Sequence, residues 1–397
     1  MTLIPTGLRQ RPDVPAFAIC ALWLIAANLR QSLVFSPDSG TYIAWADRLV
    51  ALNFDVVAYV KQVDFVVPPY FYLLQVLIVA LLKKTLGADW ALCFHGFNLC
   101  CVVVVLIAYW HSALRLAIRP WAIAVGFLAL SVSVDLLIWP HYMLSDTMYM
   151  ALAMLAVYAA IGVIQSAGPS QGASTGGVSH LVKVVLLLLF WCLLLTISRP
   201  SSPPLMFALA LSPCLPWLSG YLGTTGRLSV AIVTGGLLLT LGYATLAWDA
   251  LHTDPQALSS AWRLITEHLR EGGIIHHRLE TYQPTPQSMM DVFAIYLRRL
   301  LWFFSPYAQG FSLTHVLIKS AQAALIFVGL LCCLMSYSHC ASMHKASILL
   351  IIMVVLGPAF YHSAVLIDYD WRYRAPVIAP LILLATLGLS AMLRPKS

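Results

Sequence analysis

The feature that most constrains this chain is a series of long apolar segments that recurs from one end of the sequence to the other. Only 10% of the 397 residues are charged and the mean hydropathy is +0.84, whereas soluble domains carry roughly 25% charged residues. Inside a bilayer every backbone polar group must be paired within the protein, so only helices and closed barrels cross it. A barrel would show short alternating segments instead. The sequence therefore predicts an all-α polytopic membrane protein.

The positions of the apolar segments predict a single membrane domain over residues 1–397 with about 10–12 transmembrane helices. The segments lie at 14–35, 68–86, 90–112, 118–139, 145–165, 181–198, 203–218, 228–249, 315–336, 346–364 and 376–393. The connection 165–180 is rich in glycine and serine, which predicts a flexible cytoplasmic linker.

Basic residues before the first segment and after the last favour a cytoplasmic position for both termini. Counting crossings inward from the two ends then places two polar stretches, 36–66 and 250–314, outside the cytoplasm. The two counts agree only if one early segment does not cross fully; the candidates are 68–86, 90–112 and 118–139. We therefore expect a multi-pass protein of the cytoplasmic membrane, which is the inner membrane in a Gram-negative host, with its functional face on the periplasmic side.

The first acidic candidate lies just after the first apolar segment, in "SPDSGTYIAWADRL" (36–49). Asp38 occupies a Pro-Asp-Ser-Gly turn, and the apolar residues that follow have the three- and four-residue spacing of a helix on the membrane surface. Asp38 is either the N-cap of that helix or a general base at the membrane–water boundary. Asp47 lies further along the helix and is either a solvated residue or a second acidic ligand for an acceptor or metal.

The second acidic candidate is Asp146 in "WPHYMLSDTMYMAL" (139–152), which also follows a proline-containing break and precedes an apolar helix. It too is either an N-cap or a functional carboxylate on the same face as Asp38. Together the two carboxylates could bind an acceptor hydroxyl or a divalent cation. No other cofactor is predicted, and the nine cysteines, which contain no CxxC pair, suggest neither a disulfide framework nor a zinc site.

Three arginines are the candidate ligands of a phosphate. Arg199 lies in "TISRPSSPPL" (196–205), and Arg372 and Arg374 lie in "DYDWRYRAPVIAPLILL" (368–384), just before the last apolar segment. Guanidinium groups bind phosphate in a fork geometry. The alternative is that these arginines set topology or extend to the interface, but they lie on the face opposite to the one that the positive-inside rule favours.

The stretch 250–314 predicts two amphipathic helices, in "ALSSAWRLITEHLREGG" (257–273) and "QSMMDVFAIYLRRLLWFFSPY" (287–307). Between them, His276 and His277 could reach a phosphate or an acceptor. The alternatives are a solvated loop and a metal site, although metal-ligand spacing is missing.

Taken in order, these motifs resemble the GT-C superfamily of integral-membrane glycosyltransferases. The resemblance is strongest to the branch that contains protein O-mannosyltransferases and the lipid A aminoarabinose transferase. The pieces that carry it are "SPDSGTYIAWADRL" (36–49), "FVVPPYFYLL" (65–74), "LSDTMYMAL" (144–152), "SRP" (198–200) and "WRYRAPVIAPLILL" (371–384). Where many relatives have Asp-Glu in the first loop, this chain has Asp38-Ser39.

The resemblance implies a GT-C-like bundle with extracytoplasmic amphipathic helices, and transfer of a sugar from a polyprenyl-phosphate donor. The acceptor would be a lipid, a glycan or a protein. Asp38 would be the general base, Asp146 would assist in acceptor or metal binding, and the three arginines would hold the donor phosphate.

Two other functions remain open from the residues alone. A transporter or flippase would place ionisable groups near the middle of the membrane and show repeated halves, whereas here such groups lie at the ends of apolar segments. A polysaccharide polymerase or ligase would also use extracytoplasmic arginines. The net charge of +7 is spread over short loops, which predicts contact with membrane lipids and no nucleic-acid partner.

Overall fold

The computed structural model describes residues 11–62, 69–166, 177–276, 278–307, 312–365 and 372–392. Within these ranges every named element is a helix, and an isolated bridge of strand type joins Val34 and Tyr142. The prediction of an all-α chain is confirmed. Most of the predicted linker 165–180 lies outside the described residues.

The described residues form the following helices, in chain order. They are α2 (Asp13–Leu29), α3 (Pro37–Ala51), α4 (Val56–Gln62), α5 (Leu73–Leu86), α6 (Trp90–Arg115), α7 (Pro120–Ser131), α8 (Val134–Ile138), α9 (Asp146–Ser166), α10 (Gly177–Thr196), α11 (Pro203–Leu211), α12 (Leu215–Tyr221), α13 (Thr225–Leu251), α14 (Ser260–Arg270), α15 (Met289–Phe303), α16 (Leu313–Tyr337), α17 (Ser342–Val365) and α18 (Ala375–Met392). A 3-10 turn, η6 (Arg372–Arg374), leads into α18. Both amphipathic helices predicted in 250–314 are present as α14 and α15.

Six helical stretches in the described ranges are long and apolar enough to cross a membrane, or seven if the bent pair α7–α8 counts as one span. They are Tyr70–Arg115, Asp146–Ser166, Thr225–Leu251, Leu313–Tyr337, Ser342–Val365 and Arg372–Met392. The count is lower than the number of apolar segments because segments 68–86 and 90–112 fall within one stretch, Tyr70–Arg115, and because several other segments form short or broken helices. For example, 203–218 is divided between α11 and α12, and α7 and α8 meet at an angle of 53°.

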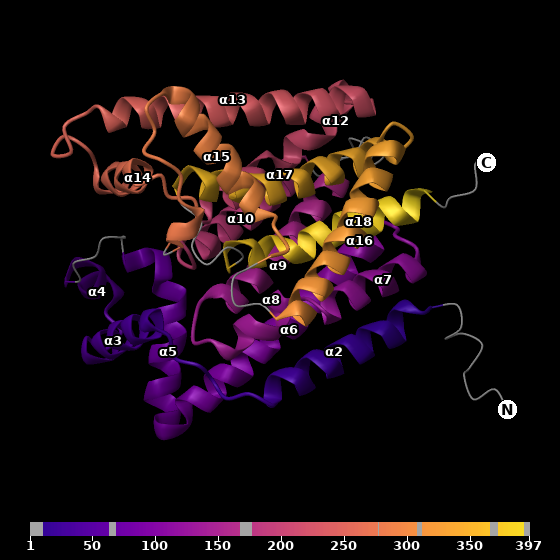
Figure 1. Cartoon of the computed structure of the whole chain (residues 1–397). Coiled ribbons are helices and arrows are strands. Elements are labelled where there is room, and N and C mark those ends of the chain that lie inside the picture. Colours follow the sequence, from indigo (N-terminus) through magenta and orange to yellow (C-terminus); the bar gives the residue numbers. More distant parts are fainter. Residues whose placement is uncertain are drawn as a thin grey trace.

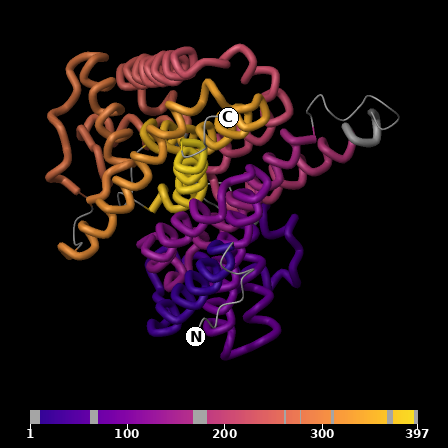
Figure 2. Tube along the Cα trace, turned by 90° about the vertical axis from the view of Figure 1, so that its right-hand side faces the viewer, coloured from indigo at the N-terminus to yellow at the C-terminus, as the bar shows by residue number. Residues whose placement is uncertain are grey.

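Helix α18 lies at the centre of the bundle, packed against α16, α9, α7 and α17 (Figure 1). Of its most apolar stretch 83% is buried, against 17% for α13 at the edge. Figure 2 shows the first part of the chain on one side of α18 and the later helices on the other. In Figure 1, the N-terminal end of α2 and the C-terminal end of α18 lie at one end of the bundle, with α3, α4 and α14 toward the other.

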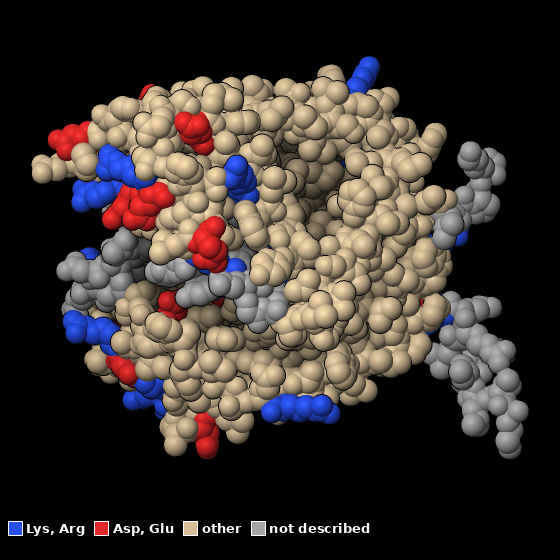
Figure 3. Space-filling view, viewed as in Figure 1, with Lys and Arg blue, Asp and Glu red and all other residues tan. Residues whose placement is uncertain are grey.

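The surface divides along the same axis. In Figure 3 most acidic and basic side chains gather over the end that holds α3, α4 and α14, while the rest of this face carries few charges. Large apolar side chains stand exposed on α13 and α16, among them Val230, Leu238, Leu317 and Phe327. Such a continuous apolar surface is unfavourable in water, so the described helices belong in a membrane.

Candidate functional site

Asp146 is the centre of the candidate site. It begins α9, its side chain is fully buried, and each of its carboxylate oxygens faces an arginine. Arg199 donates from Nη1 to Oδ1, and Arg372 donates from Nε to Oδ2 at 3.3 Å. Arg372 also donates from Nη2 to Asp38 Oδ2 at 3.0 Å. Four residues predicted from distant parts of the sequence thus form one continuous charged network, Arg199–Asp146–Arg372–Asp38.

This network runs from the interior to the surface. The side chains of Asp146, Arg199 and Arg372 are 0%, 3% and 9% exposed, whereas that of Asp38 is 53% exposed. Buried charges are tolerated only when they are paired and hydrogen-bonded, and here each buried group has a partner of opposite charge. The three buried side chains therefore hold one another in fixed positions. Asp38 is the member of the network that a molecule in solution can reach.

The local structure around Asp38 excludes the N-cap alternative. Ser36 is the N-cap of α3, and it forms a capping box with Ser39: Ser36 N–H donates to Ser39 Oγ at 2.9 Å, and Ser39 N–H donates to Ser36 Oγ at 3.4 Å. Asp38 lies inside the first turn, where the helix dipole favours a negative charge. Because the cap is made by serines, the Asp38 carboxylate is available to Arg372.

The segment before Asp146 is fixed by side chains and backbone of the first loop and of α6. Asn98 donates from Nδ2 to the carbonyl oxygens of Pro140 and Tyr142 at 3.0 and 3.1 Å. Ser39 donates from Oγ to Met143 O at 2.9 Å, beside the backbone bridge from Val34. The turns that carry Asp38 and Asp146 are therefore bonded to each other directly.

Aromatic side chains line the inner part of the network. The guanidinium carbon of Arg199 lies 5.2 Å from the ring centre of Tyr373 and 5.8 Å from that of Tyr149. Burial is the largest influence on the pKa of Arg199 and lowers it, but Asp146, Tyr373 and Tyr72 together outweigh burial, so the pKa is raised and the guanidinium stays charged. Tyr373 also stacks on His362 with ring centres 4.1 Å apart.

Arg374 lies only two residues after Arg372, but it donates hydrogen bonds to a different part of the described residues. Its Nη1 donates to Ser305 O at 2.7 Å and to Phe303 O at 3.5 Å, at the C-terminal end of α15. It also lines an apolar cavity. The structure thus separates the two arginines that the sequence grouped together.

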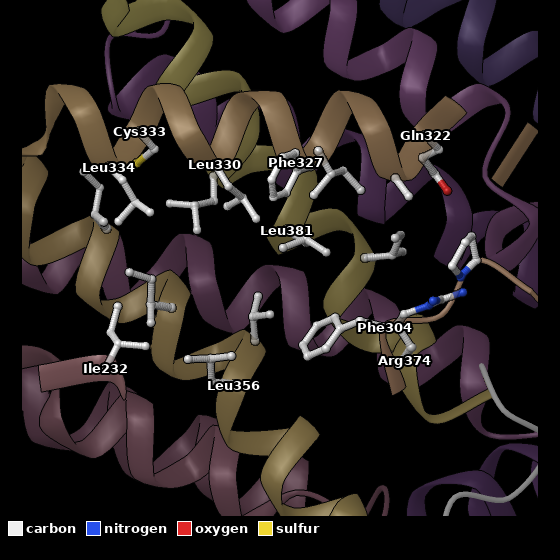
Figure 4. A pocket seen from close by; sticks show the side chains of 18 of the residues that line it. Ile232, Phe304, Gln322, Phe327, Leu330, Cys333, Leu334, Leu356, Arg374 and Leu381 are labelled. Carbon is white, nitrogen blue, oxygen red and sulfur yellow. The ribbon is translucent and has the colours of Figure 1, made fainter. Parts of the chain in front are cut away.

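That cavity has a volume of about 510 Å³ and runs between α13, α16, α17 and α18 (Figure 4). Arg374 and Gln322 lie at one end, and Cys333 and Leu334 lie at the other. Its lining includes positions from Lys319 to Tyr337 of α16. This stretch of helix is about 27 Å long at the helical rise of 1.5 Å per residue. Apart from the groups near Arg374 the lining is almost entirely apolar, so the cavity suits a hydrocarbon chain.

The remaining predicted residues lie elsewhere. Asp47 forms a salt bridge with Lys83 of α5, and its side chain is 56% exposed, which agrees with the solvated alternative. The ring of His276 lies 5.2 Å from that of His268 on α14, and His277 falls outside the described residues. The pKa of His268 is lowered, mainly by burial and in second place by the charge of His276.

The described residues contain no group of three or more histidine, cysteine or acidic side chains arranged to hold a metal ion. The space between the two carboxylates of the network is bridged by Arg372.

Two buried cations were not singled out from the sequence. Arg299 of α15 is 0% exposed and Lys319 of α16 is 2% exposed. A lysine within an apolar segment is a signal that could have been noticed, because such residues are rare in spans and usually functional. Arg299 gives a weaker signal, since it follows a second arginine on an amphipathic helix.

With the geometry established, comparison with known proteins adds no relative. No protein-family model matches the chain, and neither the curated proteins nor the solved structures that were searched contain a match. The function therefore has to be inferred from the chain's own residues.

Proposed function

We propose that this chain is a polytopic glycosyltransferase of GT-C type that moves a sugar from a polyprenyl-phosphate donor to an acceptor hydroxyl, with Asp38 as the general base. The observation that carries the proposal is the contact between Asp38 and Arg372, at 3.0 Å, where the buried ionic network reaches the surface. It brings a reachable carboxylate next to a guanidinium group, which are the two groups that such a transfer needs.

Asp38 suits the role of base because it is exposed and is not used as a helix cap. Arg372 holds Oδ2, and a carboxylate has a second oxygen that can take the proton from the acceptor hydroxyl. The hydroxyl oxygen then attacks the anomeric carbon of the donor sugar, and the bond from that carbon to the phosphate oxygen breaks. Polyprenyl phosphate leaves with the bonding electrons.

Arg372 suits the role of phosphate ligand as well. Among the described residues its hydrogen bonds use Nε and Nη2, which leaves the N–H groups of Nη1 for a phosphate oxygen. Stabilising charge on the departing phosphate lowers the barrier most when the donor groups are already fixed. Asp146, which is paired with Arg199 in the interior, holds the Arg372 guanidinium group in place.

A single displacement of this kind inverts the configuration at the anomeric carbon. Retention would need a second carboxylate as nucleophile, and among the described residues the other carboxylate of the network, Asp146, is buried and bonded to two arginines. We therefore expect an inverting enzyme.

The cavity beside Arg374 supports a donor that carries a long hydrocarbon chain. Its charged end lies two residues along the chain from Arg372, and its walls are apolar over about 27 Å of α16. A chain moving from the bilayer into this cavity leaves one apolar medium for another, so the cavity would select its occupant by shape and by the anionic headgroup.

The positions of the first and last described helices support an extracytoplasmic site in the cytoplasmic membrane. Helices α3 and α14 lie away from the end that holds the start of α2 and the end of α18 (Figure 1), and Asp38 lies in the first turn of α3. With cytoplasmic termini, this face would meet a glycolipid, glycan or protein acceptor outside the cell.

The test is transfer of radiolabelled sugar from a polyprenyl-phosphate donor in membranes that contain the full chain. Asp38→Asn keeps the shape of the side chain but removes the base, and we expect it to lower the rate by at least about 10²-fold. Asp47→Asn is the matched control on the same helix and should transfer at the wild-type rate. Normal transfer by Asp38→Asn would refute the assignment of the base, and no transfer by the wild type with any donor of this class would refute the proposed function.

A further inference from the structure

Arg299 is a buried arginine whose partners are main-chain carbonyl groups from two separate segments. Its Nε and Nη2 donate to Gly273 O at 2.9 and 2.7 Å. Its Nη1 donates to Val365 O at 2.7 Å and to Ser363 O at 3.3 Å. One guanidinium group thus joins the connection after α14 to the end of α17.

The charge of Arg299 explains the choice of partners. Burial lowers its pKa to about 10, which still leaves the group charged at neutral pH. The last carbonyls of a helix have no partner within the helix and carry the negative end of its dipole. Val365 is the last described residue of α17, so Arg299 binds carbonyl groups in the last described turn of this helix.

A second contact with the end of the α15 region is made by Arg374, which follows α17 in the chain. Arg374, at the end of η6, donates to Ser305 O at 2.7 Å, immediately after α15. The chain on both sides of 366–371 is therefore fastened to α15, by Arg299 before it and by the Arg374–Ser305 bond after it. Arg372, which bridges Asp38 and Asp146, lies seven residues after Val365 and two residues before Arg374.

The glycine pair after α14 allows the approach of Arg299 to this loop. Gly272 has a φ of +68°, and a Cβ atom there would lie 1.9 Å from the carbonyl oxygen of Gln283. The backbone can therefore turn tightly enough for Gly273 O to point at the guanidinium group, and Gln283 N–H closes the turn by donating to Gly272 O at 2.9 Å.

We propose that Arg299 is a positioning residue that keeps Arg372 aligned with Asp38 and Asp146. It does so by locking the end of α17 and the Gly273 loop against α15. Arginine is required because its planar fork reaches carbonyls on two sides at once, whereas a lysine ammonium is a single point of contact. The consequence for catalysis rests on the proposed function; the anchoring itself does not.

The kinetic test uses the full chain in lipid nanodiscs with the sugar-transfer assay. Displacement of a catalytic group by about 1 Å can cost on the order of 10²-fold in rate, so we expect Arg299→Gln to lower kcat by that order while the acceptor KM stays within a few-fold. Arg299→Lys keeps the charge and should not restore kcat. Arg298→Gln is the matched control, since Arg298 is the exposed neighbour on the same helix and bonds Gln283 instead.

The structural test is hydrogen exchange of the same proteins. In Arg299→Lys and Arg299→Gln we expect faster amide exchange in peptides covering 272–276, 361–365 and 372–378, with α6 and α9 unchanged. Arg299→Lys retains the buried charge, so this variant alone is used for the exchange test if Arg299→Gln does not fold.

The outcomes separate the two claims. Unchanged exchange in those peptides would overturn the anchoring role, and full restoration of kcat by lysine would show that charge alone suffices and would overturn the bridging role. Faster exchange with an unchanged kcat would overturn the link to Arg372. If the wild type transfers no sugar, the proposed function fails, and exchange at 372–378 alone then decides whether Arg299 positions Arg372.

Discussion

Removing the carboxylate of Asp146 should destabilise the folded chain strongly, and removing its partner as well should restore much of the loss. Asp146→Leu leaves the guanidinium of Arg199, which is 3% exposed, without the group that pairs with it. Breaking a buried ion pair from one side costs about 3–5 kcal/mol, which is roughly two to four powers of ten in the folding equilibrium. Arg372 should lose less, because it keeps Asp38.

The double variant Asp146→Leu with Arg199→Met removes both members of the inner pair. Replacing a buried ion pair by apolar residues of similar volume is often neutral or stabilising, so we expect the double variant to be more stable than the single one by at least about 2 kcal/mol. Sugar transfer should be lost in both variants, because Arg372 no longer has the Asp146 carboxylate that holds it in position.

The assay is unfolding of the purified chain by SDS titration in mixed micelles, followed by tryptophan fluorescence. Asp47→Leu is the control, because its pair with Lys83 is partly exposed and surface pairs contribute about 0–1 kcal/mol. If Asp146→Leu unfolds within 1 kcal/mol of the wild type, the pair is not buried as described. If the double variant is no better than the single, the unpaired guanidinium is not the source of the loss.

Three further predictions follow from other parts of the structure. Arg372→Lys should lower kcat by more than tenfold even though it keeps the charge, because one ammonium group cannot bond two carboxylates and a phosphate together; transfer rates at saturating donor test this, and an unchanged kcat would contradict it. Leu381→Trp, in the middle of the cavity wall (Figure 4), should impair long-chain donors far more than donors with a truncated chain, and equal loss for both would argue against a chain in the cavity. His268 has a lowered pKa in the folded state, so its contribution to stability is present above its ordinary pKa of about 6.5 and is lost as the pH falls below that value. Unfolding titrations at pH 7.5 and pH 5 should therefore show a smaller loss in His268→Gln than in the wild type, and an identical loss would contradict the assignment.

The meeting of Asp38, Asp146 and Arg372 could be predicted from the sequence because it depends on the order of apolar segments. Segments that cross a membrane fix which polar ends share a face, and the basic flanks orient them. The number of spans could not be derived in this way. Apolar composition does not reveal where a helix breaks, as it does between α11 and α12 and between α7 and α8.

The partners of each side chain were less predictable than the shared face. The N-cap of α3 is Ser36 rather than Asp38, and both residues fit the statistics of helix starts. Arg372 and Arg374 point to different partners because they lie on a 3-10 turn, where each residue turns the chain by about 120°. The position of Arg299 depends on carbonyl groups from distant segments, and sequence spacing alone carries no signal for them.

The backbone bridge between Val34 and Tyr142 has a mechanical consequence. Together with the Ser39–Met143 bond it couples the exit of α2 to the entrance of α9, so that a tilt of either helix would drag the other along. Displacements elsewhere in the bundle would then leave the spacing of Asp38 and Asp146 nearly constant, because the two turns that carry these acids would move together.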